Sequence, residues 1–228
     1  MSPRLSGERL VRRSSGEDAA RYIQRLIFDG ELRPGARVPQ DEIAQALGIS
    51  RIPVREALIA LERGGWVTIE LHRGAFVSAL DEQGVRDHYE LYGIVYGLAA
   101  RRAVARGAGA LQTTLPGIVD SLRSTSDPAP FHDLVLAFHG AVLSAARSPR
   151  IAVALRALSG LVPGNFFQLV PEAMDVERAG LTTIAVAIAG RDADAAASEY
   201  ARMLGRQADN VVAVFRDRGV LLAASADG

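Results

Sequence analysis

The chain has 228 residues, of which 49% are hydrophobic, and its 26 basic residues balance 26 acidic residues to a formal net charge of zero. This composition supports a sizeable core and excludes a polycation, so any nucleic-acid surface has to be local. The absence of cysteine excludes disulfides, thiolate catalysis and cysteine-ligated zinc. Apolar stretches end well before the ~18 residues of a membrane span, and the N-terminal segment lacks the apolar run of a signal peptide. We therefore expect a cytoplasmic protein that has no membrane association.

The first 80 residues combine short helices with one hairpin. Residues 1–15 predict a flexible arm, and apolar residues at helical spacing predict a helix over 17–29. A short helix is expected over 40–47, Gly48 breaks it, and Ser50 opens another helix that runs to about Arg63. Residues 66–71 and 75–80 are rich in β-branched side chains and predict a hairpin around the polar turn between them.

From Asp81 onward the pattern is helical, and the run TSDPAP, residues 125–130, predicts a loop between two helices. The chain is therefore predicted to be mainly α. A winged helix-turn-helix of three helices and a β-hairpin wing is expected at residues 16–80, followed by an all-α bundle at residues 81–228.

Two arginines stand at the start of the second helix of the predicted helix-turn-helix. Arg51 and Arg55 lie four residues apart, and cations at a helix N-terminus are unfavourable by a few tenths of a kcal/mol. That end of the helix enters the DNA major groove, where arginine reaches phosphates and guanine edges. Ser50 is a good N-cap, and Pro53 is tolerated in the first turn. The pattern favours DNA contact, and the alternative is a pair of solvated surface charges.

The hairpin tip adds a second basic element. His72, Arg73 and Gly74 place a basic turn where a wing reaches the DNA backbone or minor groove, although a polar turn with glycine explains them equally well. Residues 1–80 hold 12 arginines against 10 acidic residues, an excess of only two. Specific placement and dimer avidity must therefore supply much of any DNA affinity.

The run PGARVPQDEIAQALGISRIPVREALIALERGGWV, residues 34–67, resembles the N-terminal domain of GntR-family transcriptional regulators, with SRIPVREAL as its most specific segment. The resemblance implies a winged helix that binds double-stranded operator DNA. The DNA-facing positions that it implies are Arg37, Gln40, Ser50, Arg51, Ile52, Pro53, Arg55, His72, Arg73 and Gly74. Where the family often has an arginine in the preceding helix, this chain has Asp41. A carboxylate cannot hold a phosphate, so we expect Gln40 or Arg37 to replace that contact.

Residues 81 to about 216 resemble the FadR-like effector domain of this family, called FCD, through ELYGIVYGLAARRAV, LVLAFHGAVLSAARSPRI and AIAGRDADAAA. The resemblance implies a six- or seven-helix bundle that forms homodimers and encloses a cavity for a small-molecule effector. The effector-binding positions are expected to be Tyr92, Tyr96, Val135, His139, Asn165, Leu181 and Met203. The two tyrosines replace an arginine and a glutamate of the subfamily, so the effector should be less anionic than usual, unless they are ordinary core aromatics.

Many members of the subfamily hold a divalent metal through an aspartate and three histidines, and the resemblance implies that only His139 survives here. We therefore predict no metal and no cofactor. Glu177 and Glu199 lie one turn before two lost histidines and leave a rebuilt metal site as an alternative. Another alternative makes His139 a buried histidine that hydrogen-bonds a carbonyl.

The function predicted from these features is a repressor that acts as a homodimer, binds operator DNA and responds to a small organic effector. An enzyme with His139 as general base is the contrasting hypothesis. It is disfavoured because no nucleophile–base pair and no glycine-rich phosphate loop are visible. A third hypothesis is a protein-interaction module that uses the winged helix without DNA.

Overall fold

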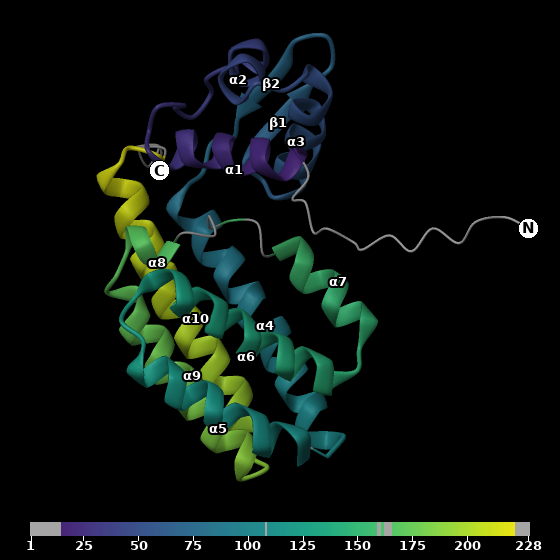
Figure 1. Ribbon diagram of the computed structural model, residues 1–228, viewed down its shortest axis with the longest axis vertical. Helices are drawn as coiled ribbons and strands as arrows, with labels where there is room; N and C mark the ends of the chain where they lie inside the picture. The colour runs from purple at the N-terminus through teal and green to yellow at the C-terminus, as the bar shows by residue number, and fades with distance from the viewer. Residues whose placement is uncertain (1–14, 108, 159–160, 162–165, 222–228) are drawn as a thin grey trace, which may run out of the picture.

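The computed structural model describes residues 15–107, 109–158, 161 and 166–221, and an N-terminal unit of helices and a hairpin caps one end of a helical bundle (Figure 1). The N-terminal unit consists of α1 (Ser15–Phe28), α2 (Gln40–Leu47), α3 (Arg51–Arg63), β1 (Val67–Glu70) and β2 (Gly74–Val77). The predicted winged helix-turn-helix architecture is confirmed.

The turn between α2 and α3 follows from two residues. Gly48 takes a left-handed backbone with φ 64°, which ends α2 while its N–H bonds to carbonyls of the last turn. Ser50 occupies the N-cap position of α3 with extended backbone, as predicted, but its side chain makes no capping hydrogen bond. The expected capping bond is therefore wrong, and the exposed hydroxyl remains available to a ligand.

The hairpin is antiparallel, and its register pairs Val67 with Val77 and Glu70 with Gly74. Its buried side chains include Val67, Ala75 and Val77, which join the core shared with α1 and α3. Strand β2 shows the alternation of side chains between two faces, since Ala75 and Val77 are buried and Phe76 is partly exposed, whereas in β1 only Val67 is buried and Ile69 is 39% exposed.

The described part of the bundle has seven helices. They are α4 (Glu82–Ala105), α5 (Gly109–Ser124), α6 (Pro128–Ala146), α7 (Pro149–Leu158), α8 (Phe166–Leu169), α9 (Ala173–Ala189) and α10 (Ala193–Asp217). The loop predicted at residues 125–130 is shorter than expected, because Pro128 starts α6 behind the N-cap Asp127. Proline fits the first helical turn, where its missing N–H has no partner within the helix.

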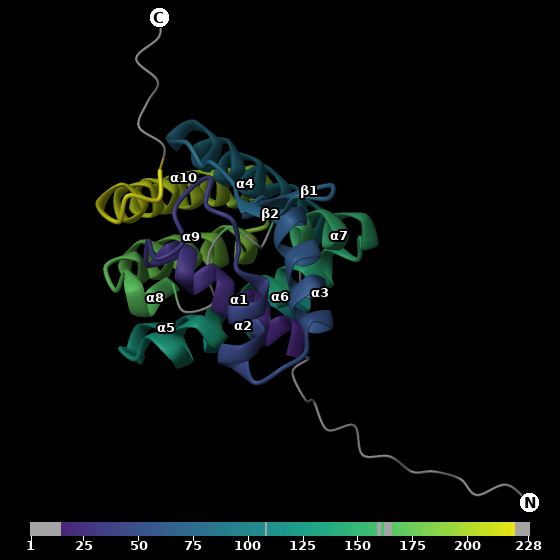
Figure 2. The same ribbon diagram turned by 90° about the horizontal axis from the view of Figure 1, so that it is seen from above.

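The long helices α4 and α10 lie side by side (Figures 1 and 2). Glycines on α4 permit this close approach, because a Cβ at Gly93 would stand 3.0 Å from Cα of Ala201. A Cβ at Gly97 would stand 3.2 Å from the Cβ of Ala197. Small residues on both helices thus bring their backbones together.

Within the described residues, one helix, α6, has the length and apolar composition of a membrane span. Its Phe131, Phe138 and Val142 are buried, and it packs against α4, α5 and α9. These contacts are those of a core helix in a bundle.

The end of α10 contacts the N-terminal unit through aromatic packing. Phe215 meets Phe28 of α1 at a ring-centroid distance of 5.4 Å and Trp66 at 6.2 Å, both edge to face. Arg218 Nη1 donates to Asp29 Oδ1 at 2.9 Å, and its guanidinium lies 4.4 Å from the centroid of the Phe28 ring. The three buried rings therefore fix the position of the N-terminal unit on the bundle.

We predict that Phe215→Ala lowers the free energy of unfolding by about 3–5 kcal/mol, the usual result of truncating a buried phenylalanine. Amide hydrogen exchange in α1 should accelerate, because α1 loses its contact with α10. The control Phe138→Ala truncates another buried phenylalanine inside the bundle. Unchanged exchange in α1 of the Phe215 variant, relative to this control, would contradict the anchoring role.

Candidate DNA-binding surface and buried polar cluster

A groove of about 910 Å³ opens between the start of α2, the start of α3 and the hairpin. We call it the head groove, and seven of the ten residues predicted to contact DNA line it. These are Arg37, Gln40, Arg51, Ile52, Arg55, His72 and Gly74. Of the other three, Ser50 and Pro53 flank it at the start of α3, and Arg73 lies at the hairpin tip. Residues from three separate elements therefore share one concave surface.

The two arginines of α3 differ in their contacts. Arg51 is exposed, and its Nε lies 2.5 Å from Oδ1 of Asp41 on α2. Arg55 is also exposed, and no acidic side chain among the described residues pairs with it. Arg55 thus lines the head groove without an ion pair to the described residues, whereas Arg51 is held by Asp41 through Nε.

On the hairpin, Gly74 makes room for Arg37. Gly74 has φ +108°, and a Cβ there would stand 3.2 Å from Nε of Arg37. Any other residue would be strained and would displace that arginine. Arg73 pairs with Glu70 and lies 5.4 Å from the centroid of the Phe76 ring, so the hairpin itself holds it.

The head groove also contains residues that the sequence did not single out. Its further apolar members include Leu58, Ile59, Ile69 and Leu71. Ile52, a predicted contact, is 68% exposed, and Leu71 is 82% exposed. Exposed apolar side chains beside arginines suit contacts with thymine methyl groups. Helical periodicity predicts which face of a helix is buried, so it does not identify apolar side chains that are exposed.

The charges along the head groove nearly cancel. Arg37, Arg51 and Arg55 face Asp41, Glu42 and Glu70 among its lining residues. A strong positive field is therefore absent from this lining, and each arginine must act through its position.

In the bundle, four polar side chains form the buried polar cluster, which consists of His139, Glu177, Tyr200 and Gln207. His139 Nδ1 lies 3.3 Å from the Tyr200 hydroxyl, and its Nε2 lies 3.3 Å from Glu177 Oε1. Gln207 Nε2 donates to Glu177 Oε2 at 2.8 Å. The alternative of a carbonyl partner for His139 is wrong, because both ring nitrogens face side chains.

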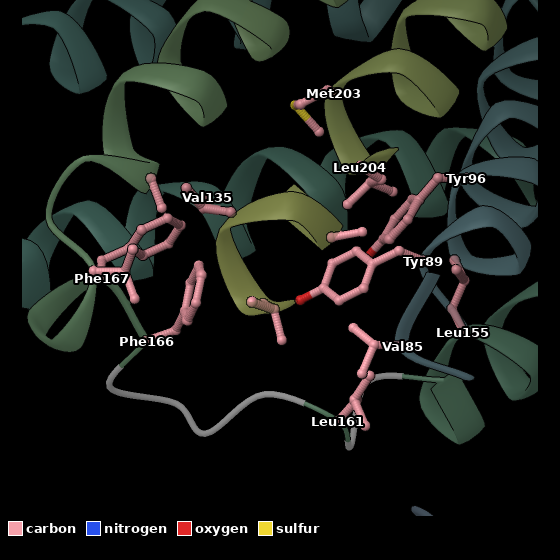
Figure 3. Close-up of a cluster of buried hydrophobic side chains, with 14 of the residues drawn as sticks. Val85, Tyr89, Tyr96, Val135, Leu155, Leu161, Phe166, Phe167, Met203 and Leu204 are labelled. Carbon is pink, nitrogen blue, oxygen red and sulfur yellow. The ribbon is translucent and has the colours of Figure 1, made fainter. Parts of the chain in front are cut away.

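Tyrosines of α4 border this cluster. Tyr96 stacks on Tyr200 at 5.2 Å between centroids and lies 4.5 Å from the His139 ring. The Tyr92 and Tyr96 hydroxyls are 3.4 Å apart. Figure 3 shows the Tyr89 ring extending from α4 into the middle of the neighbouring apolar side chains. Burial raises the pKa of the Tyr89, Tyr96 and Tyr200 phenols, so these hydroxyls stay protonated.

The other predicted effector residues are packed in the core. Val135, Leu181 and Met203 are all buried, and a Cβ on Gly180 would clash with the Met203 side chain. Asn165 lies outside the described residues. These positions remain predictions as effector contacts, and the ring of Tyr96 contacts His139 and Tyr200 of the polar cluster.

Two members of the buried polar cluster, Tyr200 and Gln207, were missed from the sequence. They follow one face of α10 at helical spacing together with Met203, which the sequence did predict, and this spacing is the signal that joins them. His132 lies seven residues before His139 on α6, and its buried Nδ1 has no hydrogen-bond partner in the described chain. Burial lowers the pKa of His132 and favours the neutral imidazole.

A rebuilt metal site receives no support from the geometry. Across the described ranges, no three His, Cys, Asp or Glu side chains converge as metal ligands. Glu199 instead accepts a hydrogen bond from Arg202 Nε at 2.7 Å, and Glu177 bonds His139 and Gln207. The absence of metal stays a prediction.

The helix-turn-helix, its hairpin and the arginines of α3 define a winged-helix, DNA-binding class of regulator. Two family models match the chain. Residues 15–77 match "Bacterial regulatory proteins, gntR family", and residues 87–206 match "FCD domain". The chain belongs to the GntR family and carries an FCD domain. The curated relatives that it matches are named as transcriptional regulators.

Two curated relatives illustrate the similarity. An uncharacterized HTH-type transcriptional regulator of Mycobacterium tuberculosis (strain ATCC 25618 / H37Rv) is 34% identical over 68% of this chain, which spans 63% of that relative's length. A relative from Paenarthrobacter nicotinovorans, named a probable D-xylose utilization operon transcriptional repressor, is 28% identical over 67% of this chain and 69% of its own.

Solved structures share the fold. E. coli McbR/YncC aligns with a TM-score of 0.62 at 16% identity, covering 90% of this chain and 99% of its own. A transcriptional regulator GntR from Rhodococcus sp. RHA1 aligns with a TM-score of 0.55 at 25% identity, covering 88% of this chain and 99% of its own.

Proposed function

We propose that the chain is a cytoplasmic, homodimeric repressor whose affinity for operator DNA is controlled by a small organic effector bound in the helical bundle. The observation that carries the DNA-binding half is the convergence of seven predicted contacts on the head groove. The name of the Paenarthrobacter relative supports repression.

In this proposal the start of α3 enters the major groove of each half-site. Arg55 reads a base or holds a phosphate with its exposed guanidinium, and each good bidentate pair with guanine contributes about 1–3 kcal/mol of discrimination. Arg37 and His72 reach the backbone from the hairpin side, and the apolar side chains meet base edges.

We expect Arg55→Ala to abolish specific operator binding while the melting temperature stays within about a degree or two of wild type, because the side chain is exposed and forms no ion pair with the described residues. Fluorescence anisotropy with a duplex selected from a random pool measures the affinity. Arg63→Ala, at the opposite end of the same helix, is the matched control.

Equal operator affinity of the Arg55 and Arg63 variants at matched salt would contradict this role. No salt-dependent retention of the wild type on a DNA column would favour the protein-interaction module over a DNA-binding protein.

The homodimer is proposed to form through α4. Leu91, Ile94 and Leu98 recur at helical spacing on this helix and are 53%, 55% and 42% exposed. Three large apolar side chains in one exposed stripe are unusual on a monomer and typical of an interface. A second copy is the proposed occupant, because a two-fold operator requires two recognition helices.

We predict that Ile94→Glu converts the dimer into a monomer at micromolar concentration, since a carboxylate would be buried in the interface without a partner. Analytical ultracentrifugation measures the mass. Val186→Glu introduces the same charge at a 67% exposed position on α9 and should remain dimeric. A dimeric Ile94→Glu variant would contradict the proposed interface on α4.

The effector is proposed to bind against the buried polar cluster. Glu177 is 4% exposed, and its partners in the described chain are a histidine ring and an amide rather than an arginine. Tyrosine faces from α4 and α10 lie beside it. A ligand that carries an ammonium or another hydrogen-bond donor suits this carboxylate and these rings better than an anion does.

A path from this cluster to the DNA runs along α10. Tyr200 and Gln207 of α10 belong to the cluster, and Phe215 of the same helix packs against the N-terminal unit. An effector that shifts α10 therefore changes how the two N-terminal units are held, which couples two distinct sites.

We predict that the purified protein carries no stoichiometric zinc, nickel or manganese, and that organic amines from a compound screen raise its melting temperature. A ligand at one hundred times its Kd stabilises the folded state by about 2.7 kcal/mol. Glu177→Gln should lose this response, whereas Glu172→Gln, an exposed carboxylate at the start of α9, should keep it. One equivalent of metal by elemental analysis, or an amine response unchanged by Glu177→Gln, would contradict the proposed pocket.

A further inference from the structure

One ion pair crosses the head groove between the two helices of the helix-turn-helix. Asp41 is the second residue of α2 and Arg51 is the first residue of α3, and Oδ1 of the carboxylate lies 2.5 Å from Nε of the guanidinium. Their side chains are 65% and 72% exposed. An exposed pair of this kind contributes little to folding stability, so stability does not account for it.

The guanidinium atom that the carboxylate contacts determines which N–H groups of Arg51 remain available to a base. Arginine has five N–H donors in a rigid planar fork, and the carboxylate engages the one on Nε. The terminal nitrogens remain, and this edge matches the O6 and N7 acceptors of guanine. A carboxylate on Nε therefore orients the guanidinium while leaving its base-reading edge available.

The carboxylate is itself well placed to act as a support. Asp41 lies in the first turn of α2, where the helix dipole stabilises a negative charge. DNA docking would exclude water from the head groove, and the attraction between the pair strengthens as the local dielectric falls.

We propose that Asp41 is a positioning residue that determines sequence specificity by fixing the orientation of Arg51 in the major groove. This inference rests on the proposed function, in which the start of α3 reads the operator. The negative charge has a second consequence, because Asp41 repels phosphates and weakens binding to unrelated DNA. Asp41 thus lowers the affinity for the DNA backbone and raises the selectivity for particular bases.

The test is a selection of bound duplexes from a random-sequence pool, carried out with the full-length wild type, Arg51→Ala, Asp41→Asn, Asp41→Ala and Glu42→Gln. Glu42 is the matched control, because it follows Asp41 in the same turn and lines the same groove without pairing to Arg51. Melting temperatures verify that each variant is folded.

Arg51→Ala should lose preference at one base pair of each half-site. Both Asp41 variants should weaken the preference at that same base pair by about fivefold or more, the lower end of what one bidentate contact provides. The affinity of both Asp41 variants for unrelated duplex should rise relative to wild type. This rise should be at least as large as the rise that Glu42→Gln produces. Glu42→Gln should keep the wild-type motif.

Three results would overturn the inference. An unchanged motif in both Asp41 variants would show that Arg51 needs no support. A loss at a different base pair from that of Arg51→Ala would mean that Asp41 reads a base itself, for example a cytosine amine. An equal loss of base preference in Glu42→Gln would mean that the change in net charge, and not the contact with Arg51, causes the effect. If the wild type itself selects no motif, the proposed function fails together with this inference.

Discussion

The packing of Phe215 against Phe28 and Trp66 fixes the N-terminal unit on the helical bundle, because it joins α10 to that unit. All three rings are buried, so the contact contributes apolar burial that loop connections cannot provide. The same helix carries Tyr200 and Gln207 of the buried polar cluster. One rigid element thus contacts both the proposed effector site and the unit that carries the head groove.

The head groove shows how a chain of zero net charge can serve as a DNA-binding regulator. Its lining arginines are matched by nearby carboxylates, so long-range attraction contributes little. Under the proposed function, affinity comes from a few oriented contacts and from two half-sites bound together. Under this proposal, such a surface has a low affinity for unrelated DNA and discriminates more strongly between bases.

Much of this fold is predictable from the sequence because its signals are local. Gly48 and Ser50 mark the turn between α2 and α3, and β-branched runs mark the hairpin. Contacts between distant residues carry no such signal. The bonds of Glu177 to His139 and Gln207 span 38 and 30 residues, and their partners become neighbours only when three helices pack. The orientation of Asp41 toward Arg51 is likewise a tertiary feature, since it depends on the angle between two helices.

Interference by guanine N7 methylation tests the central claim, which is that arginines at the start of α3 read base edges in the major groove. The operator selected from a random pool is treated with dimethyl sulfate, and bound and free fractions are compared. The account predicts that methylation blocks binding at guanines placed symmetrically in the two half-sites, about one helical turn or a multiple of it apart. Uniform binding of all methylated duplexes that contain these guanines would contradict it.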